Sequence, residues 1–318
     1  MQTRIASTQD INKDSYLKAI ADRIITNSGA PADWGTSSEV PADFGLAQSS
    51  STNPYELDMD KISRLNNLNS YFLYYADVEN VAKLSNIALG ISLSQIMALN
   101  VLQLSNFTVG SDISFTFTVS ASIDSKPTSA NLHCYVAADN YLSDFNGSIT
   151  DTGSGGVTVQ IPSAATDHAL LIVFARASID DRITSFAIYN FADSTQESIP
   201  TSTSLDLSPL NYNLNLNYSS PDLTVQNSYV FSYSYQQTLS AIEGGQTPIP
   251  KLIDNSPLIL VVCGLNGADP FQEWTAYPQI PLKAGANFAD SEQNMFSYII
   301  TVNGVLYRLD VSLGDLPK

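Results

Sequence analysis

The sequence predicts a mainly β protein of the α+β class, in which N-terminal helices precede an antiparallel β-sandwich of immunoglobulin-like architecture in two parts. Two observations carry this prediction. Apolar residues recur with the helical period of 3.6 over residues 1–90, whereas from Ile91 onward they recur with the period of 2 that is typical of half-buried strands. Short strand-like runs, separated by Ser, Thr, Gly and Asp, then follow at the spacing of an antiparallel sandwich.

Three helices are expected in the N-terminal part. The first is amphipathic and ends at the turn formers of residues 27–31. The second is expected to begin at residues 53–56, because Asn suits the N-cap, Pro the first helical position, and Glu can bond back to the cap. The third is expected over residues 77–89, with Gly90 as its left-handed terminator. The apolar face of the first helix consists of Leu17, Ile20, Ala21, Ile24 and Ile25.

The expected strands begin at residue 91 and end in a clear hairpin signal. Asn303-Gly304, the pair that favours a two-residue turn, lies between the alternating runs 296–302 and 305–311. Apolar runs of strand length, such as residues 169–175, are typical of strands buried on both faces. The other expected strands are 96–104, 113–121, 131–137, 156–161, 169–177, 183–191, 210–218, 228–238 and 257–263.

The β part is expected to divide at a Ser- and Thr-rich linker over residues 193–204. We therefore predict three parts. Residues 1–90 form a helical region packed on the first β part, residues 91–198 form a β-sandwich, and residues 199–318 form a second β-rich domain.

The composition favours an extracellular protein at the cell surface. The net charge is 14 − 31 = −17, which argues against nucleic acid and anionic membrane surfaces as partners. Only 14% of the residues are charged, and Ser, Thr and Asn supply the polarity instead. The sequence has no apolar window of about 18 residues that could span a membrane. The start of the chain has no apolar signal region, so we expect the native protein to begin before Met1.

The most informative segment is residues 20–47. After the first helix, it carries two near-copies of one phrase, PADWG at residues 31–35 and PADFG at residues 41–45. The pattern matches no catalytic motif. It indicates an ordered loop that buries one aromatic residue per copy, Trp34 and Phe44, while Pro fixes the backbone.

Two cysteines and three glycosylation sequons are further candidate sites. Cys134 and Cys263 lie in apolar strand-like runs, and two interpretations stay open: two buried thiols, or a disulfide in an oxidising compartment. The sequons begin at Asn106, Asn146 and Asn217, which are possible sites of surface glycans.

Catalysis has little support in the sequence. None of the common nucleophile, phosphate-binding, dinucleotide or zinc motifs is present, and we expect no cofactor and no metal. Glu243, Asp269 and Glu273 are the candidates for a glycosidase carboxylate pair, the least favoured interpretation. Tyr233 and Tyr235 alternate along one expected strand, where they suit a glycan contact, a subunit interface or ordinary cross-strand packing.

The N-terminal part resembles archaeal pilin-like (type IV pilin-related) secreted cell-surface proteins. In those proteins a hydrophobic N-terminal helix leads into an ADR phrase, a Gly, a Pro and an Asp or Asn before Trp. A GLA follows, and then a short helix with Lys and Leu four residues apart. The matching residues are Ala21-Asp22-Arg23, Gly29, Pro31, Asp33-Trp34, Gly45-Leu46-Ala47 and Lys61-Ile62-x-x-Leu65. The resemblance covers residues 1–90, and the β remainder is similar only in general character.

The resemblance implies an extracellular structural protein, either a pilin-like filament subunit or an anchored surface component without catalytic activity. Its partners would be copies of itself or other surface proteins. It would contact the membrane only through an apolar N-terminal helix that is absent from this chain. The alternative is a carbohydrate-binding adhesin that uses Tyr233 and Tyr235 on its β surface.

Overall fold

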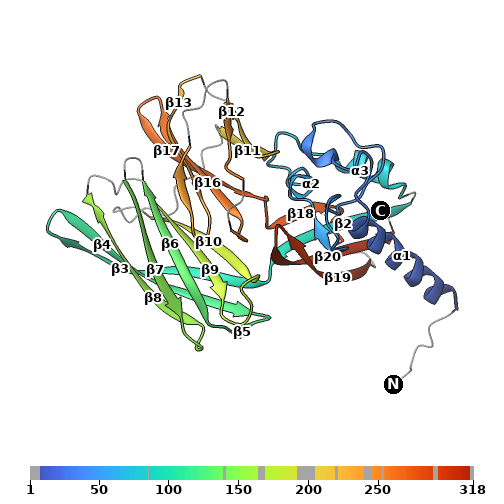
Figure 1. Ribbon diagram of the computed structural model, residues 1–318, viewed down its shortest axis with the longest axis horizontal. Helices are drawn as coiled ribbons and strands as arrows, with labels where there is room; N and C mark the ends of the chain where they lie inside the picture. The colour runs from blue at the N-terminus through green and yellow to red at the C-terminus, as the bar shows by residue number, and fades with distance from the viewer. Residues whose placement is uncertain are drawn as a thin grey trace. The chain divides into compact units, whose positions relative to one another are not determined.

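The computed structural model describes residues 8–84, 86–138, 141–163, 169–191, 205–218, 221–239, 245–251, 254–288 and 293–315. The chain divides into two compact units (Figure 1). Unit 1 consists of Met1–Ser94, Gln279–Asn303 and Tyr307–Lys318, and unit 2 consists of Gln95–Pro278 with Gly304–Leu306.

This division differs from the predicted one. The boundary expected at residue 90 lies close to the observed one at Ser94, but the boundary expected at residue 198 falls inside unit 2. The predicted linker 193–204 lies outside the described residues. The N-terminal region joins the C-terminal strands, because a strand near the N-terminus pairs with one near the C-terminus: Leu57 lies opposite Val302 in a parallel ladder.

Unit 1 contains a five-stranded sheet in the order β1-β19-β20-β2-β18, together with α1, α2, α3 and a 3-10 turn, η1. The blue N-terminal helix and the red C-terminal strands lie side by side in Figure 1. No described helix has both the length and the apolar character needed to cross a membrane. The bounds are α1 Thr8–Thr26, η1 Trp34–Thr36, β1 Glu56–Leu57, α2 Met59–Ser63, α3 Tyr75–Ala82, β2 Ile87–Gln95, β18 Leu282–Gly285, β19 Gln293–Val302 and β20 Val305–Asp315.

The first predicted helix is confirmed, and the start and end of the others differ from expectation. Helix α1 ends at Thr26, as the turn formers after it predict, and Leu17, Ala21, Ile24 and Ile25 are buried. Helix α2 begins later than expected: Asp58 is its N-cap and accepts from the amides of residues 60 and 61. The earlier residues 56–57 form strand β1 instead, because β19 offers them a hydrogen-bonding edge.

The third helix is shorter than expected. Helix α3 ends with Lys83 in the left-handed conformation (φ 57°), whereas Gly90 lies inside strand β2. The C-terminal hairpin is confirmed at its turn. Asn303 and Gly304 have φ values of 50° and 77°, the positive pair that a type I′ turn requires.

Unit 2 is built from antiparallel sheets, and this confirms the predicted fold class of a mainly β sandwich with few helices. Sheet β10-β9-β6-β7 packs on one side against the sheet of β3, β4, β5 and β8, and on the other side against sheet β14-β13-β16-β17. A small sheet, β11-β12-β15, completes the unit. The bounds are β3 Met97–Val109, β4 Asp112–Ile123, β5 Lys126–Pro127, β6 Ala130–Ala138, β7 Tyr141–Ile149, β8 Ser154–Pro162, β9 Ala169–Ala177, β10 Thr184–Phe191, β11 Leu205–Leu210, β12 Asn213–Tyr218, β13 Leu223–Phe231, β14 Gln236–Thr238, β15 Gln246–Pro248, β16 Leu258–Asn266 and β17 Asp269–Tyr277.

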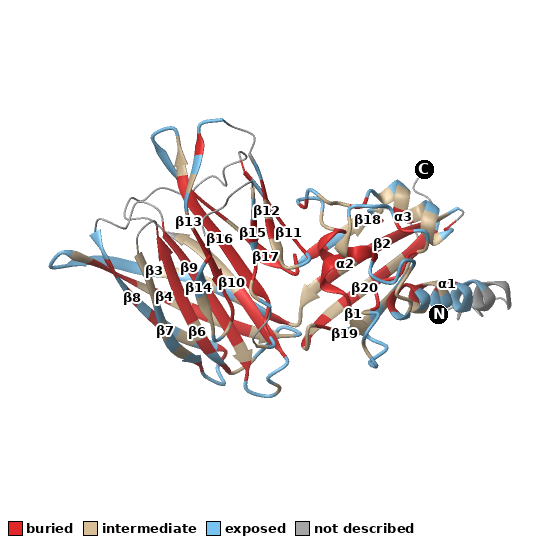
Figure 2. Cartoon of the chain, turned by 45° about the horizontal axis from the view of Figure 1, so that its top comes forward, coloured by how far each residue is buried: buried red, intermediate tan, exposed pale blue. Residues whose placement is uncertain are grey.

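Strand β9 lies inside the middle sheet, and this explains its continuous apolar sequence. Leu171 and Val173 face the core shared with β4, whereas Ile172 and Phe174 face the core shared with β16. Both faces of the strand are therefore removed from water, and Figure 2 shows the strand as buried. The expectation drawn from its run of apolar residues is confirmed.

The two cysteines lie in different cores. Cys134 belongs to the core between β4 and β9, and Cys263 to the core between β9 and β16. Both are buried thiols and no disulfide joins them, so the first of the two interpretations applies. Burial raises the pKa of the Cys134 thiol to about 12, because the thiolate would be poorly solvated.

We expect neither thiol to react with Ellman's reagent in the native protein at neutral pH, because both sulfur atoms are buried and inaccessible to the reagent. In denaturant without reductant, two thiols per chain should react. A count below two under those conditions, restored by prior reduction, would show that a disulfide exists.

Candidate functional site

Helix α2 and its C-cap residue carry two buried cations, Lys61 and Arg64, that organise the segment after α1. Lys61 is 0% exposed and Arg64 is 1% exposed. They are three residues apart, so they project from the same side of the helix. We call these two side chains the cation cluster.

The Lys61 ammonium group binds three backbone carbonyls from separate points of the loop. Its Nζ donates to the carbonyl oxygens of Ser28, Ala32 and Ala47, each at 2.8 Å. Three is the full donor capacity of an ammonium group. The beginning, middle and end of the loop therefore meet at one buried atom.

Arg64 extends the same arrangement. Its Nη1 donates to the carbonyl of Trp34 at 2.8 Å and to that of Glu39 at 3.1 Å, and its Nη2 donates to the carbonyl of Ser38 at 3.2 Å. Its Nε donates to the carbonyl of Tyr71 at 3.0 Å. The guanidinium group thus joins the loop between the two phrases to the segment that follows α2.

Both aromatic residues of the repeated phrase are buried beside these cations. Trp34 is 1% exposed and Phe44 is 2% exposed, with ring centroids 5.8 Å apart. The indole Nε1 of Trp34 donates to the carbonyl of Gly45 at 2.9 Å, so the first copy of the phrase bonds the second. The Arg64 guanidinium carbon lies 5.3 Å from the indole centroid, within cation–π range.

The glycine in each copy is needed for close approach. A Cβ atom on Gly45 would lie 2.2 Å from the carbonyl oxygen of Asn27, and one on Gly35 would lie 2.6 Å from the amide nitrogen of Lys61. Any larger residue would push the loop away from the end of α1 or from α2.

Burial governs the titration of the cluster. Desolvation lowers the pKa of Lys61, which the nearby Asp58 and Asp33 carboxylates counteract in part, and desolvation also lowers the pKa of Arg64. Desolvation raises the pKa of Asp58, although the amides that it caps favour the carboxylate. The carbonyl dipoles around Lys61 replace the water that its charge loses.

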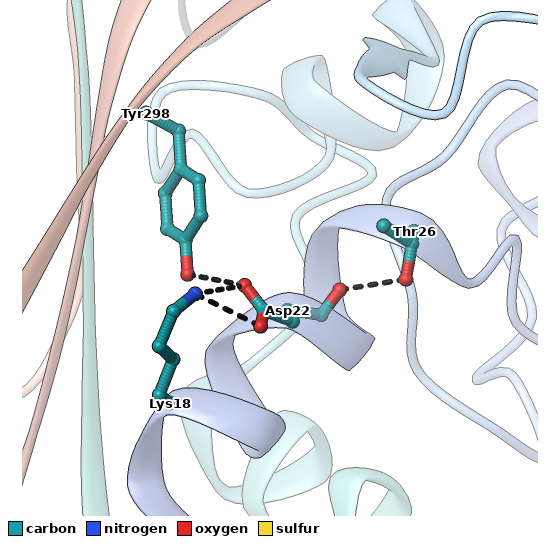
Figure 3. Close-up of polar contacts among 4 residues, drawn as sticks. All are labelled: Lys18, Asp22, Thr26 and Tyr298. Atoms are coloured by element: carbon teal, nitrogen blue, oxygen red, sulfur yellow. Dashed lines mark hydrogen bonds and ion pairs between the residues drawn. The ribbon is translucent and has the colours of Figure 1, made fainter. Parts of the chain in front are cut away.

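A second contact fixes the body of α1 to the sheet. The Asp22 carboxylate accepts from Lys18 Nζ at 2.8 and 2.9 Å and from the hydroxyl of Tyr298 at 2.8 Å (Figure 3). Tyr298 belongs to β19, so this contact crosses from helix to sheet. Thr26 Oγ1 donates to the backbone carbonyl of Asp22 at 2.7 Å at the end of the helix. We call Lys18, Asp22 and Tyr298 the helix junction.

The junction favours the ionised form of Asp22. Desolvation raises the pKa of Asp22, but the hydrogen bonds from Lys18 and Tyr298 outweigh it, and the pKa falls below its ordinary value. Desolvation, followed by the hydrogen bond to Asp22, raises the pKa of Tyr298. The group therefore holds a carboxylate and a neutral phenol at neutral pH.

The two predicted tyrosines do not share a strand. Strand β13 ends at Phe231, and the amide of Ser232 donates to the carbonyl of Tyr235 at 2.8 Å, which makes 232–235 a turn. The expected alternation on one strand face is therefore wrong, because the turn ends the strand first. The Tyr233 ring lies under the Arg176 guanidinium at 4.0 Å, and the Tyr235 hydroxyl bonds Gln237.

The sequon asparagines are all exposed, in β3 for Asn106, in β7 for Asn146 and in β12 for Asn217.

The candidate glycosidase carboxylates do not form a pair. Asp269 and Glu273 lie four residues apart on one strand, about 13 Å at strand spacing, which is too far for a glycosidase pair. Glu243 lies outside the described residues. The described residues contain no group of three or more His, Cys, Asp or Glu that could hold a metal ion.

Sequence reasoning named Lys61 only as part of a resembling phrase and did not name Arg64. The segment from Leu57 to Leu65 mixes apolar and polar residues, so nothing in the sequence indicated that these two cations are buried. The carbonyls that they bind come from residues 28–71 and could not be assigned from sequence.

No protein-family model matches the chain, and no curated protein does. Among solved structures, it is similar to HBP35 of Porphyromonas gingivalis, with 13% identity and a TM-score of 0.20 over 57% of this chain and 63% of that chain. It is also similar to the FN1–FN3 domains of chicken CNTN1, with 13% identity and a TM-score of 0.20 over 56% of this chain and 66% of that chain. In both cases the chain spans less than two thirds of the neighbour. Neither neighbour is described as a pilin, and similarity this low carries no functional argument.

We expect Trp34→Ala to lower the free energy of unfolding by roughly 3 kcal/mol, because it removes a buried aromatic side chain and the hydrogen bond to Gly45. Urea unfolding followed by circular dichroism measures this without relying on tryptophan fluorescence. Val40→Ala is the matched control, since Val40 lies in the same loop and is 52% exposed. A loss below about 1 kcal/mol for Trp34→Ala would contradict the buried placement.

We expect a favourable coupling of roughly 1 kcal/mol between Asp22 and Tyr298 at pH 7 in a double-mutant cycle of Asp22→Asn and Tyr298→Phe. Because the pKa of Asp22 is lower in the folded state, its ionised form adds stability above its unfolded pKa of about 3.8. That stability is lost as the pH falls through the folded-state value. Urea unfolding of the four proteins at neutral and acidic pH measures the coupling, and a value of zero at pH 7 would refute the junction.

Proposed function

We propose that the chain is an extracellular structural protein of the cell surface, a pilin-like filament subunit or anchored surface component. In this proposal the N-terminal helix attaches the protein to the cell surface or to a neighbouring subunit, and the β-sheets of the two units face the extracellular surroundings. The observation that carries the proposal is the double attachment of α1, by the helix junction along its length and by the cation cluster beyond its end.

The attachment suits a protein that is held from its N-terminal side. Pulling α1 away from β19 would break the hydrogen bond between Asp22 and Tyr298. The force would then act on the loop whose backbone carbonyls bind Lys61. Separating the ammonium group from its carbonyls would leave buried polar groups without partners, at a cost of about 1–3 kcal/mol for each group. Several of these contacts would have to break together, so α1 and the sheet should resist tension as one body.

Other features agree with this role. The resemblance of residues 21–66 to pilin-like surface proteins points to the same arrangement of a helix followed by a head. The low content of charged residues, 14%, and the abundance of Ser, Thr and Asn suit an extracellular environment. The net charge of −17 disfavours nucleic acid as a partner.

The first test is mass-spectrometric sequencing of the N-terminus of the native protein, isolated from its own cells together with its surface fraction. We expect residues before Met1 that include about 20 consecutive apolar ones, enough for a membrane helix or a filament core. We also expect the protein to be accessible to protease added to intact cells. A native start at or near Met1, on a protein released free into the medium, would overturn the proposal.

A carbohydrate-binding adhesin is the alternative. One observation favours it: the rings of His133 and Tyr233 lie 6.1 Å apart with the Arg176 guanidinium stacked on Tyr233, a combination of ring faces and donors that suits sugars. A glycan array separates the two functions. Specific binding that is lost on Tyr233→Ala and Tyr235→Ala would favour the adhesin, and the absence of binding would favour the structural role.

A further inference from the structure

Strand β3 is a long edge strand with exposed apolar side chains. Among the strands that the structure describes, it pairs with β4 alone. Four large apolar residues of this strand are exposed, and the end of the β3–β4 hairpin is pale blue in Figure 2. They are Leu102 at 56%, Leu104 at 59%, Phe107 at 55% and Val109 at 42% exposure. Natural proteins usually protect such an edge with charges or proline.

A bulge explains why the side chains after it, Phe107 and Val109, point to solvent. The register shifts between Gln103 and Ser105, so Leu104 has no partner in β4. Before the bulge, Met97 and its alternate neighbours face the core of unit 2. One inserted residue reverses the alternation, and Phe107 is therefore carried to the outer face.

This edge is also free of charge. Residues 97–111 contain no Asp, Glu, Lys or Arg, although the chain carries a net charge of −17. Two copies of so acidic a chain repel each other over most approaches. The repulsion is weakest where both present an uncharged surface, and at β3 each copy also offers apolar area and unpaired backbone groups.

We propose that β3 is the contact between two copies of this chain, with residues 104–109 of the two strands paired antiparallel about a two-fold axis. An edge strand is complementary to itself in this orientation, because each strand offers both donors and acceptors. The pairing buries Leu104, Phe107 and Val109 of both copies and joins two sheets into one. The proposal deepens the proposed structural function, on which it rests, by naming the surface of self-assembly.

The pairing also assigns a consequence to the sequon at Asn106. This residue is exposed in the middle of the paired segment. Side chains of a strand project from the faces of the sheet, so a glycan at Asn106 would lie over one face of the paired edge and crowd the second copy. We therefore expect the unmodified chain to associate more strongly than the glycosylated one.

Sedimentation velocity of the full, unglycosylated chain over a wide concentration range tests the pairing. We expect the mass to rise from that of one chain to that of two, and the association to strengthen with added salt, which screens the repulsion. Hydrogen exchange should show protection of residues 104–109 that increases with concentration. A chain that stays monomeric in high salt overturns the proposal, and so does a series of ever larger masses, because a two-fold contact closes.

The variant Leu104→Lys with Phe107→Lys should weaken association by roughly tenfold or more, because it removes apolar area and brings like charges together. Both residues are exposed, so the fold is expected to survive. The matched control is Ile179→Lys with Ile299→Lys, which adds the same charge at sites that are 71% and 52% exposed. Equal weakening by the control would refute the assignment to β3. Neither failure affects the native N-terminus, which tests the proposed function separately.

Discussion

The Lys61 ammonium group, buried with three backbone carbonyls, is the interaction on which unit 1 depends. Its acceptors are the carbonyls of Ser28, Ala32 and Ala47, so one nitrogen atom holds the loop closed. These hydrogen bonds help to offset the conformational entropy that is lost when the loop is ordered. A buried charge is tolerated only when polar groups replace its water, and here the backbone supplies them. The repeated phrase fits this requirement, because its aromatic residues exclude water and its glycines let the carbonyls approach.

The same site determines how the two ends of the chain come together. Helix α1 runs into the loop held by the cation cluster, and β1 follows the loop to pair with β19. The helix junction then joins Asp22 to Tyr298 across more than 270 residues of sequence. Attachment at the N-terminus is therefore attachment to the C-terminal hairpin, and this is the physical basis for proposing an anchored or assembled subunit.

Unit 2 follows a different logic, in which the inner strands of a central sheet are buried on both faces. Cys134 on β6 and Cys263 on β16 are buried in the two cores that flank this sheet. The sheet of β3, β4, β5 and β8 differs, because only one of its faces packs against a core. At its edge, a single bulge in β3 exposes apolar side chains where no charge protects the strand. The contrast between these sheets directs the proposed self-association to one edge.

The sequence by itself determined what depends on local patterns: the apolar face of α1, the buried strand β9, the turn at Asn303-Gly304 and the mainly β class. Local signals failed where a distant partner prevailed, as at residues 56–57, which pair with β19 instead of entering a helix. They also failed at Tyr233, where a turn interrupts the alternation. Only the tertiary structure decided which carbonyls Lys61 and Arg64 bind and which strands form unit 1. Hydrogen bonds between residues far apart in sequence leave no periodic trace in either segment, and they are chosen by the geometry of the folded chain.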